Sequence, residues 1–354
     1  MQQGSDRPLT DDEIAVINAF QGGFPVVAEP YVTAAAALTH HGVQMDADTL
    51  AATVAELTEA GVLSRFGALI NAEAIGGAAT LVAMHAPLER FDAIAAAVNG
   101  HDAVAHNYER EHPHLNMWFV VSVADPGEVD PVLEAIASET GQTPYNLPKQ
   151  REFRVEAKFP LAGPLADAEI DLTAVGGPTP TPAEAPLSAD DRALLIEIQD
   201  GFPLGRRPYA AIAETLGADA SWVRERLRAL LAAGMLRRIG VIPNHYRLGY
   251  SHNGMTVWDV PDRAVAQVGA AVAELSFVTH CYERPRHPGV WPYNFFAMTH
   301  GRSADESAAR VAEVAAVMRE HFDVDARGWD TLFSTQILKK TGIRIADRLA
   351  GAAA

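Results

Sequence analysis

An internal repeat restricts the fold of this chain more than any other feature of its sequence. "LTDDEIAVINAFQGGFPVVAEPY" at residues 9–31 is matched by "LSADDRALLIEIQDGFPLGRRPY" at residues 187–209. "LTEAGVLSRFGALIN" at residues 57–71 is matched by "LLAAGMLRRIGVIPN" at residues 230–244. Similarity at one long interval indicates a tandem duplication, with copies of about 150–160 residues.

Each copy begins with a pattern typical of a winged helix-turn-helix. Thr10 and Ser188 are candidate N-caps, because each precedes a helical pattern with acidic residues in its first turn. In copy two, "PYAAIAETLGADASWVRERLRALLAAGML" predicts a helix, a turn at Gly217 and a second helix over residues 222–231. "LRRIGVIPN" then predicts a strand or wing.

The hydrophobic period changes after the wing, from helices alone to strands alternating with helices. In copy two this pattern predicts elements over residues 252–260, 262–275, 277–284, 294–301, 304–321 and 327–338. In copy one it predicts elements over residues 80–86, 91–99, 103–110, 116–123, 129–140 and 151–158. The order βαββαβ is ferredoxin-like. The predicted fold class is therefore α+β, a tandem duplication in which each copy has a winged helix-turn-helix unit and a ferredoxin-like unit.

Between the copies lies a stretch rich in Pro, Gly and small polar residues, which predicts a linker. The predicted boundaries are 1–75 and 76–160 for the two units of copy one, 161–186 for the linker, and 187–248 and 249–354 for the two units of copy two.

Composition and charge narrow the class of protein. The 354 residues contain one cysteine, Cys281, which excludes an internal disulfide framework and suits a reducing compartment. We expect a cytoplasmic protein, because no signal peptide or membrane span is recognisable. The net charge is −17, and all of it falls on residues 1–177. DNA-binding proteins gain affinity through Lys and Arg, so this charge argues against DNA as a partner.

The most unusual residues form a motif that occurs in both copies. "HNYEREHPHLNMWFVVSV" at residues 106–123 and "HCYERPRHPGVWPYNFFAMTHG" at residues 280–301 share H-x-Y-E-R, a His-Pro pair and an Asn before an apolar run. Alternate residues of a strand point to the same face, so the His, Tyr and Arg of each motif are expected to share one face. Cys281 would then point away from them, buried and inert.

A winged helix followed by βαββαβ resembles the Lrp/AsnC architecture, and the motifs narrow the likeness to siroheme decarboxylases in their fused D–L form. The stretches that carry it in copy two are "GFPLGRRPY", "HCYERPRHPGVWPYNFFAMTHG" and "QILKKTGIR". Copy one supplies "GGFPVVAEPY", "HNYEREHPHLNMWFVV" and "TPYNLPKQREFRVE".

The resemblance implies a reaction. Siroheme would lose carbon dioxide from its C12 and C18 acetates, giving 12,18-didecarboxysiroheme for heme d1 synthesis in denitrification, or for alternative heme synthesis. It implies no added cofactor, with the iron-containing siroheme as substrate. The implied partners are siroheme, didecarboxysiroheme and sister decarboxylase subunits, with no DNA and no membrane.

The candidate site residues follow from the resemblance and from the chemistry of the side chains. Siroheme is a flat polycarboxylate, which Arg can bind through paired hydrogen bonds and aromatic rings can face. Decarboxylation also needs a proton donor, a role suited to His or Tyr. The candidate catalytic residues are His280, Tyr282, Arg284 and His287. The candidate substrate-binding residues are His106, Tyr108, Arg110, His112, His114, Lys149, Arg237, Arg238, Trp291, Tyr293 and Asn294.

Several alternatives stay open at this point. The histidines could donate a proton or ligate the siroheme iron, with His287 and His112 as candidate axial ligands and no metal site of the protein's own. Trp291 and Tyr293 could belong to a core or a dimer interface. The chain could also be a non-catalytic tetrapyrrole sensor or carrier.

The remaining rival is a transcription regulator. The second helix of copy two carries Arg224, Arg226 and Arg228, but the matching stretch of copy one, residues 46–61, has no Lys or Arg. The two copies also differ in their motifs. Copy one has His-Pro-His-Leu where copy two has His-Pro-Gly-Val-Trp-Pro-Tyr, so we expect copy two to hold most of the site. We further expect the two α/β units to pair through their sheets, with siroheme between the two H-x-Y-E-R loops.

Overall fold

A computed structural model describes residues 7–168, 170, 187–322 and 328–340. These residues form two compact units, and each unit takes elements from both copies. Unit 1 contains residues 7–76 and 158–249, and unit 2 contains residues 77–157 and 250–340. Most of the predicted linker lies outside the described residues.

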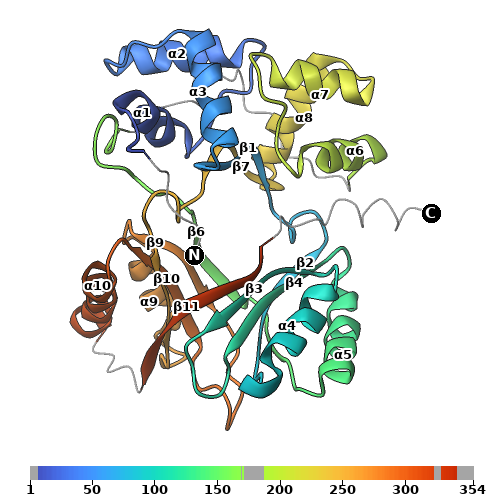
Figure 1. Cartoon of the computed structure of the whole chain (residues 1–354), viewed down its shortest axis with the longest axis vertical. Helices are drawn as coiled ribbons and strands as arrows, with labels where there is room; N and C mark the ends of the chain where they lie inside the picture. Colours follow the sequence, from blue (N-terminus) through green and yellow to red (C-terminus); the bar gives the residue numbers. More distant parts are fainter. Residues whose placement is uncertain (1–6, 169, 171–186, 323–327, 341–354) are drawn as a thin grey trace. The chain divides into compact units, whose positions relative to one another are not determined.

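Unit 1 contains two sets of three helices and a strand, one set from each copy (Figure 1). Copy one supplies α1 (Asp11–Phe20), α2 (Pro30–His40), α3 (Ala47–Glu59) and β1 (Leu63–Ile70). Copy two supplies α6 (Ala189–Ile198), α7 (Pro208–Leu216), α8 (Ala220–Ala232) and β7 (Leu236–Pro243).

The predicted ends of these helices are confirmed. Thr10 and Ser188 each accept a hydrogen bond from the third helical residue, whose carboxylate in turn accepts one from the cap backbone. This reciprocal arrangement is a capping box. Gly217 follows α7 with φ +62°, a left-handed conformation that glycine adopts without steric cost. The predicted helix-turn-helix of copy two therefore forms.

The strands β1 and β7 pair antiparallel, and Gly67 lies opposite Gly240 in their register. Both glycines allow close approach of the backbone beside them. A Cβ on Gly67 would lie 2.9 Å from Gly201 Cα, and a Cβ on Gly240 would overlap the carbonyl oxygen of Phe20. Gly201 begins the G-F-P stretch of copy two, so part of this repeated stretch packs against the strand pair.

We predict that Gly240→Ala lowers the free energy of unfolding by about 2 kcal/mol, because the methyl group has no room beside a backbone carbonyl. Urea unfolding followed by circular dichroism measures this change. The control is Gly22→Ala in the same unit, where a Cβ would meet only the flexible end of Lys158. Equal midpoints for the two variants would contradict the prediction.

Unit 2 contains the two ferredoxin-like sets. Copy one supplies β2 (Ala78–Met84), α4 (Phe91–Gly100), β3 (Val104–Arg110), β4 (Met117–Val123), α5 (Val129–Thr140), β5 (Tyr145–Leu147) and β6 (Arg151–Val155), with short 3-10 turns at Leu88–Arg90 and Pro126–Glu128. Copy two supplies β8 (His252–Trp258), α9 (Val265–Ala273), β9 (Val278–Glu283), β10 (Phe295–Gly301), α10 (Ala304–Phe322) and β11 (Trp329–Lys340).

All the strands of unit 2 join one antiparallel sheet in the order β5-β2-β4-β3-β11-β8-β10-β9-β6. The sheet is continuous because each copy gives its last strand to the other. The first half of β11 pairs with β8 of its own copy, and the second half pairs with β3 of copy one. In copy one, two separate strands make the corresponding pairs. β5 pairs with β2 of its own copy, and β6 pairs with β9 of copy two.

This exchange changes one detail of the predicted topology. Residues 151–158 were expected to complete the ferredoxin-like sheet of copy one, but β5 completes it and β6 extends the sheet of copy two. The two sheet edges, β5 and β6, are separated only by residues 148–150. At about 3.5 Å per residue, so short a connection requires the sheet to curl until its edges approach each other.

The two faces of the curled sheet are packed differently. Helices α4 and α5 cover the strands of copy one, and α9 and α10 cover those of copy two (Figure 1). On the opposite face, called here the helix-free face, no described helix of unit 2 packs. It has its own apolar cluster, with Trp118 and Leu147 from copy one and Trp291, Phe296 and Leu332 from copy two. The two copies thus share one core on this face. Among the described residues, no helix has the length and apolar character to span a membrane.

Candidate functional site

The His and Tyr of the repeated motif lie on the helix-free face of the sheet in both copies. The residue between them points to the helices: Asn107 donates to the side chain of Asn99 on α4, and Cys281 belongs to the cluster beneath α9 and α10. Burial raises the pKa of the Cys281 thiol, which keeps it protonated and unreactive. The motif side chains on the helix-free face therefore include His106, Tyr108, His280 and Tyr282.

Each copy presents these side chains in the same arrangement. The ring centroids of His106 and Tyr108 are 6.3 Å apart, and those of His280 and Tyr282 are 6.1 Å apart. An Arg guanidinium lies over each tyrosine ring, at 5.5 Å for Arg110 and 4.8 Å for Arg284. A cation near a ring face is attracted to its π electrons. Two related His-Tyr-Arg sets therefore exist, one in each copy.

The two arginines also bind the exchanged last strands. Arg110 donates from Nη1 to the carbonyl oxygen of Leu332 at 2.8 Å, and Arg284 donates from Nη1 to that of Leu147. Both side chains are more than nine-tenths buried. Leu332 and Leu147 hold corresponding positions in β11 and β5, and each belongs to the copy that does not supply its arginine. These arginines thus link the copies, besides contacting the tyrosines.

The strand that arrives from the other copy gives each set different neighbours. Beside Tyr282, copy one supplies Lys149, whose Nζ is 5.9 Å from the ring centroid and which is paired with Glu152. The register places Ser334 at the position corresponding to Lys149 beside the copy-one motif. The set around Tyr282 therefore has a second cation close to it, and a serine takes that position in the set around Tyr108.

His287 and Trp291 form a tight turn after β9, with Gly289 at φ +79° between them. The Nε2 of His287 is 2.8 Å from the carbonyl oxygen of Asn146. A carbonyl oxygen only accepts, so this nitrogen carries a proton and donates it. His287 therefore ties its loop to β5 of the other copy, where the Tyr145 ring also contacts it at 5.3 Å.

Trp291 is 1% exposed and lies at the centre of the core on the helix-free face. Its ring centroid is 5.0 Å from that of Trp118, 4.9 Å from that of Tyr293 and 5.5 Å from that of His112. Burial, with the nearby carboxylates of Asp330 and Asp259, raises the pKa of Tyr293. The candidate aromatic residues thus form one edge-to-face cluster.

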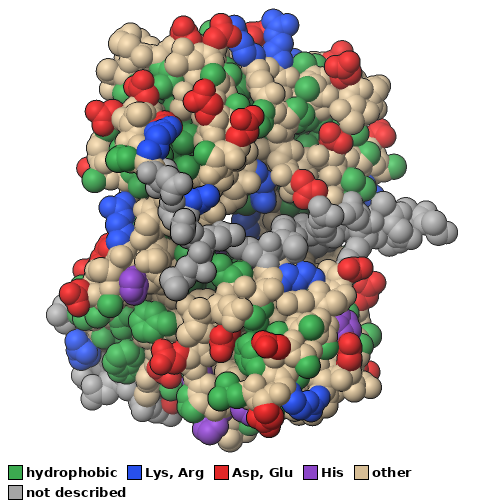
Figure 2. All heavy atoms as spheres, in the orientation of Figure 1, with side chains coloured by type: hydrophobic (Ala, Val, Ile, Leu, Met, Phe, Trp, Pro, Cys, Tyr) green, Lys and Arg blue, Asp and Glu red, His purple; other side chains and the backbone are tan. Residues whose placement is uncertain are grey.

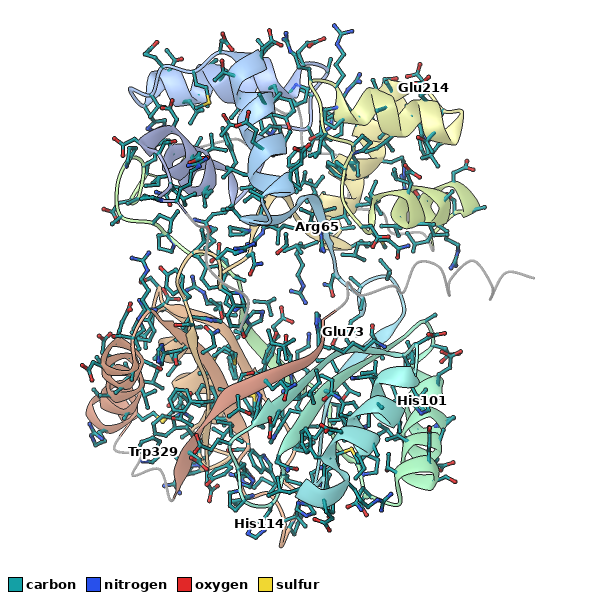
Figure 3. The ribbon with its side chains drawn as sticks, viewed as in Figure 1. Arg65, Glu73, His101, His114, Glu214 and Trp329 are labelled. Carbon is teal, nitrogen blue, oxygen red and sulfur yellow. The ribbon has the colours of Figure 1, made fainter. Side chains whose placement is uncertain are left out.

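The two histidines that follow β3 differ in exposure. The Nδ1 of His112 accepts hydrogen bonds from the backbone N–H groups of Leu115, at 2.8 Å, and His114, at 3.2 Å. Burial lowers the pKa of His112, so its neutral form is favoured. His114 is exposed at the tip of this loop (Figure 3). His112 therefore shapes the turn before Trp118.

Asn294 and Arg286 bind other parts of the copy-two fold. The amide of Asn294 donates to the carbonyl of Val260 at 3.0 Å and accepts from its N–H at 2.9 Å. The guanidinium of Arg286 binds the carboxylates of Asp259 and Asp262. Both side chains fix the connection that follows β8.

The remaining candidate cations belong to unit 1. Arg237 and Arg238 lie on β7, where Arg238 is opposite Leu69 of β1. Arg237 donates to the side chain of Asn71. Both arginines therefore belong to unit 1, whereas the His-Tyr-Arg sets lie on the sheet of unit 2. A contact of Arg237 or Arg238 with the substrate stays a prediction.

Sequence reasoning missed three polar residues, Thr279, His300 and Asn253, that form a hydrogen-bonded series ending at His280. The hydroxyl of Thr279 is 2.9 Å from His280 Nδ1 and 2.8 Å from His300 Nε2. His300 Nδ1 is 2.6 Å from Asn253 Oδ1. These residues lie on three adjacent strands, and only their register reveals that they meet. The sequence does contain a Thr-His pair twice, at residues 279–280 and 299–300. It does not show that Thr279 and His300 are in contact.

Comparison with known proteins agrees with this architecture. The model of the AsnC-like ligand binding domain matches residues 74–154 and 247–339, and the model of the siroheme decarboxylase NirDL-like HTH domain matches residues 191–237. The siroheme decarboxylase NirDL subunit of Paracoccus pantotrophus is 34% identical over 96% of this chain and 98% of its own length. The chain belongs to the siroheme decarboxylase family. Its resemblance to this family, predicted from the motifs, is confirmed.

Two further relatives extend the comparison. The crystal structure of the siroheme decarboxylase NirDL in complex with an iron-uroporphyrin III analogue superposes with a TM-score of 0.67 and 25% identity, covering 98% of this chain and all of that one. The siroheme decarboxylase NirH subunit of Stutzerimonas stutzeri is 49% identical over 43% of this chain and 88% of its own length. That match has the length of a single copy. The predicted fold class is confirmed by the domain models and the solved structure.

We predict that Arg284→Ala lowers the stability of unit 2 by about 2 kcal/mol, because it removes a buried charged donor from a carbonyl of the other copy. Arg110→Ala should cost a similar amount. Urea unfolding followed by tryptophan fluorescence reports mainly on unit 2, which holds four of the five tryptophans.

The control is Arg151→Ala, which removes a half-exposed ion pair with Glu283 and should cost less than about 1 kcal/mol. An Arg284→Ala variant as stable as the wild type would show that the bond to Leu147 contributes nothing to the linkage of the copies.

Proposed function

We propose that this chain is a siroheme decarboxylase that removes carbon dioxide from the C12 and C18 acetates of siroheme, giving 12,18-didecarboxysiroheme for heme d1 synthesis. The observation that carries the proposal is its similarity to a siroheme decarboxylase along nearly the whole chain, together with two His-Tyr-Arg sets on one face of the sheet. A relative of the same architecture binds an iron-uroporphyrin III analogue, a tetrapyrrole of the same general shape.

The reaction asks for little from the protein beyond placing the substrate and supplying a proton. When a carboxylate leaves as carbon dioxide, its electron pair stays on the CH2 carbon and can spread into the conjugated macrocycle. A proton added to that carbon then completes the methyl group. The macrocycle serves as the electron sink, so we propose that no organic cofactor takes part.

His280 is the proposed proton donor. It is partly exposed on the helix-free face, beside Tyr282, and a positioned imidazole typically contributes about 10²–10⁴-fold. His287 and His112 have nitrogen atoms bonded to the backbone, which supports a role in bracing their loops. We propose that His112 is not an axial ligand to the iron, because its Nδ1 lone pair already accepts from the backbone. His287 stays a proposed axial ligand, because its bond through Nε2 leaves the Nδ1 lone pair for the iron.

The copy-two set is the proposed principal site. Lys149 supplies a cation beside Tyr282, and its side chain is 15% exposed. An ammonium group near a partly exposed face can attract a substrate carboxylate. The corresponding position beside the copy-one set is Ser334, which supplies no charge.

A role in DNA binding has little support. Arg226 on α8 binds Asp191 through its Nε at 2.7 Å, and α3 contains no Lys or Arg. On the face drawn in Figure 2, the described Lys and Arg side chains are interspersed with Asp and Glu. Recognition of phosphates needs a basic surface, which the helix-turn-helix of copy one does not supply.

We predict that the purified chain, incubated anaerobically with siroheme, converts it to a product lighter by one or two molecules of carbon dioxide. Mass spectrometry of the tetrapyrrole measures the number lost. Sister subunits of the NirH type are the proposed partners, so a parallel incubation includes one. A tetrapyrrole that binds but keeps its mass in both incubations would identify a sensor or carrier and overturn the proposal.

We further predict that His280→Gln lowers the turnover number at least about 100-fold, because it removes the proton donor but leaves a polar side chain of similar size. The matched variant is His106→Gln, the corresponding change in copy one, which should lower turnover less than about tenfold. Equal losses in the two variants would contradict the assignment of the principal site to copy two.

A further inference from the structure

A chain of three hydrogen bonds connects His280 to the interior of the sheet in copy two. Thr279 lies between the two rings, with its Oγ1 2.9 Å from His280 Nδ1 and 2.8 Å from His300 Nε2. His300 Nδ1 is then 2.6 Å from Asn253 Oδ1. Thr279, His300 and Asn253 are 2%, 6% and 5% exposed, so solvent offers them few competing partners. His280, at the end of the chain, is partly exposed.

The direction of each bond follows from the amide at the buried end. Asn253 donates from Nδ2 to the carbonyl of Tyr250 at 3.1 Å, so its Oδ1 is the atom that faces His300. This oxygen only accepts, so His300 Nδ1 must carry a proton. In a neutral imidazole the other nitrogen then accepts, and the Thr279 hydroxyl donates to His300 Nε2.

The same reasoning reaches His280. A hydroxyl has one hydrogen, and that of Thr279 is already directed to His300. Its oxygen can only accept from His280 Nδ1, which therefore carries a proton when the ring is neutral. In neutral His280 the unprotonated nitrogen is therefore Nε2. The hydrogen bond at one ring nitrogen of a histidine determines whether the other ring nitrogen carries a proton.

We propose that Thr279, His300 and Asn253 form a positioning chain that fixes His280 as the Nδ1–H tautomer and directs proton transfer through Nε2. The proposal rests on the role of His280 as proton donor given above. In the reaction, the C–C bond to the carboxylate breaks and carbon dioxide leaves with no electrons from that bond. The Nε2–H of protonated His280 gives its proton to the CH2 carbon. The ring left behind is the neutral tautomer that the chain stabilises.

Copy one lacks the side chains that would build such a chain. The register pairs Ala79 with Ser122 on β2 and β4, where copy two pairs Asn253 with His300 on β8 and β10. Ala105 precedes His106, where Thr279 precedes His280. The side chains of Ala79 and Ala105 have no polar atoms. The hydrogen-bonded residues Thr279, His300 and Asn253 are therefore a second difference between the copy-two set and the copy-one set, besides the charge of Lys149.

The first test measures the tautomer directly, in the full-length chain without substrate. Nitrogen NMR of histidine labelled with ¹⁵N reports which ring nitrogen carries the proton, and the His280→Gln variant identifies the His280 signals. At a pH where the ring is neutral, we expect His280 with its proton on Nδ1. Thr279→Val should abolish this preference and Thr279→Ser should keep it. A proton on Nε2 in the wild type, or an unchanged tautomer in Thr279→Val, would overturn the proposal.

The second test measures turnover of siroheme in the same variants. Thr279→Val should lower turnover about tenfold, roughly the effect of losing one orienting hydrogen bond, and Thr279→Ser should restore it to within about twofold. Ser122→Ala in copy one is the control and should change turnover less than about twofold. Similar losses in the Val and Ser variants would overturn the positioning role.

These tests distinguish a failure of the Thr279–His300–Asn253 positioning chain from a failure of the proposed function. A wild-type protein that shows the Nδ1–H tautomer but releases no carbon dioxide from siroheme, with or without a NirH-type subunit, would leave the hydrogen-bonded residues in place and refute the decarboxylase. A wild-type protein that decarboxylates siroheme with His280 in the other tautomer would refute only the positioning chain.

Discussion

The exchange of last strands between the copies is the interaction on which the rest of unit 2 depends. The second half of β11 pairs with β3, and β6 pairs with β9, so the two ferredoxin-like sets share one sheet. A lone ferredoxin-like sheet would leave its edge strands β3 and β9 unpaired, and exposed edges invite unwanted pairing with other chains. The exchange covers both edges. It also brings the apolar side chains of the helix-free faces into one core, in which Trp118 contacts Trp291.

The same exchange decides what surrounds each His-Tyr-Arg set. The motif itself supplies the His, the Tyr and the Arg, but the arriving strand supplies their neighbours across the copy boundary. Arg284 reaches the Leu147 carbonyl and Lys149 lies near the Tyr282 ring, and both of these partners come from copy one. Folding and the construction of the site are therefore coupled, because a copy folded alone would lack part of the surroundings of its own motif.

Much of the fold could be predicted from the sequence, since hydrophobic period and capping residues are local signals. The helix predicted over residues 129–140 coincides with α5, and Ser188 caps α6 as expected. The partner of a strand is not a local signal, which is why β6 was expected beside β2 of its own copy and not beside β9. Its substitute β5 has only three residues before Pro148, too few to show an alternating pattern.

The site shows the same limit. Alternation along the strands placed His280 and Tyr282 on one face and Cys281 on the other, as the structure has them. Alternation says nothing about side chains on neighbouring strands, so the bond from Arg284 to a main-chain carbonyl and the contact of Thr279 with His300 could not be foreseen. Residue type predicted a carboxylate-binding arginine. The register of the strands also lets Arg284 donate a hydrogen bond to the other copy.

Joining the copies in one chain permits a difference between the two sites that a symmetric dimer forbids. In a dimer of identical chains, any residue beside one motif must also lie beside the other. Here Lys149 lies beside the copy-two motif and Ser334 holds the corresponding place beside the copy-one motif. His300 and Asn253 likewise stand where copy one has Ser122 and Ala79. Copy two can thus carry polar and charged groups that copy one lacks, while copy one still supplies the strands that complete the shared sheet.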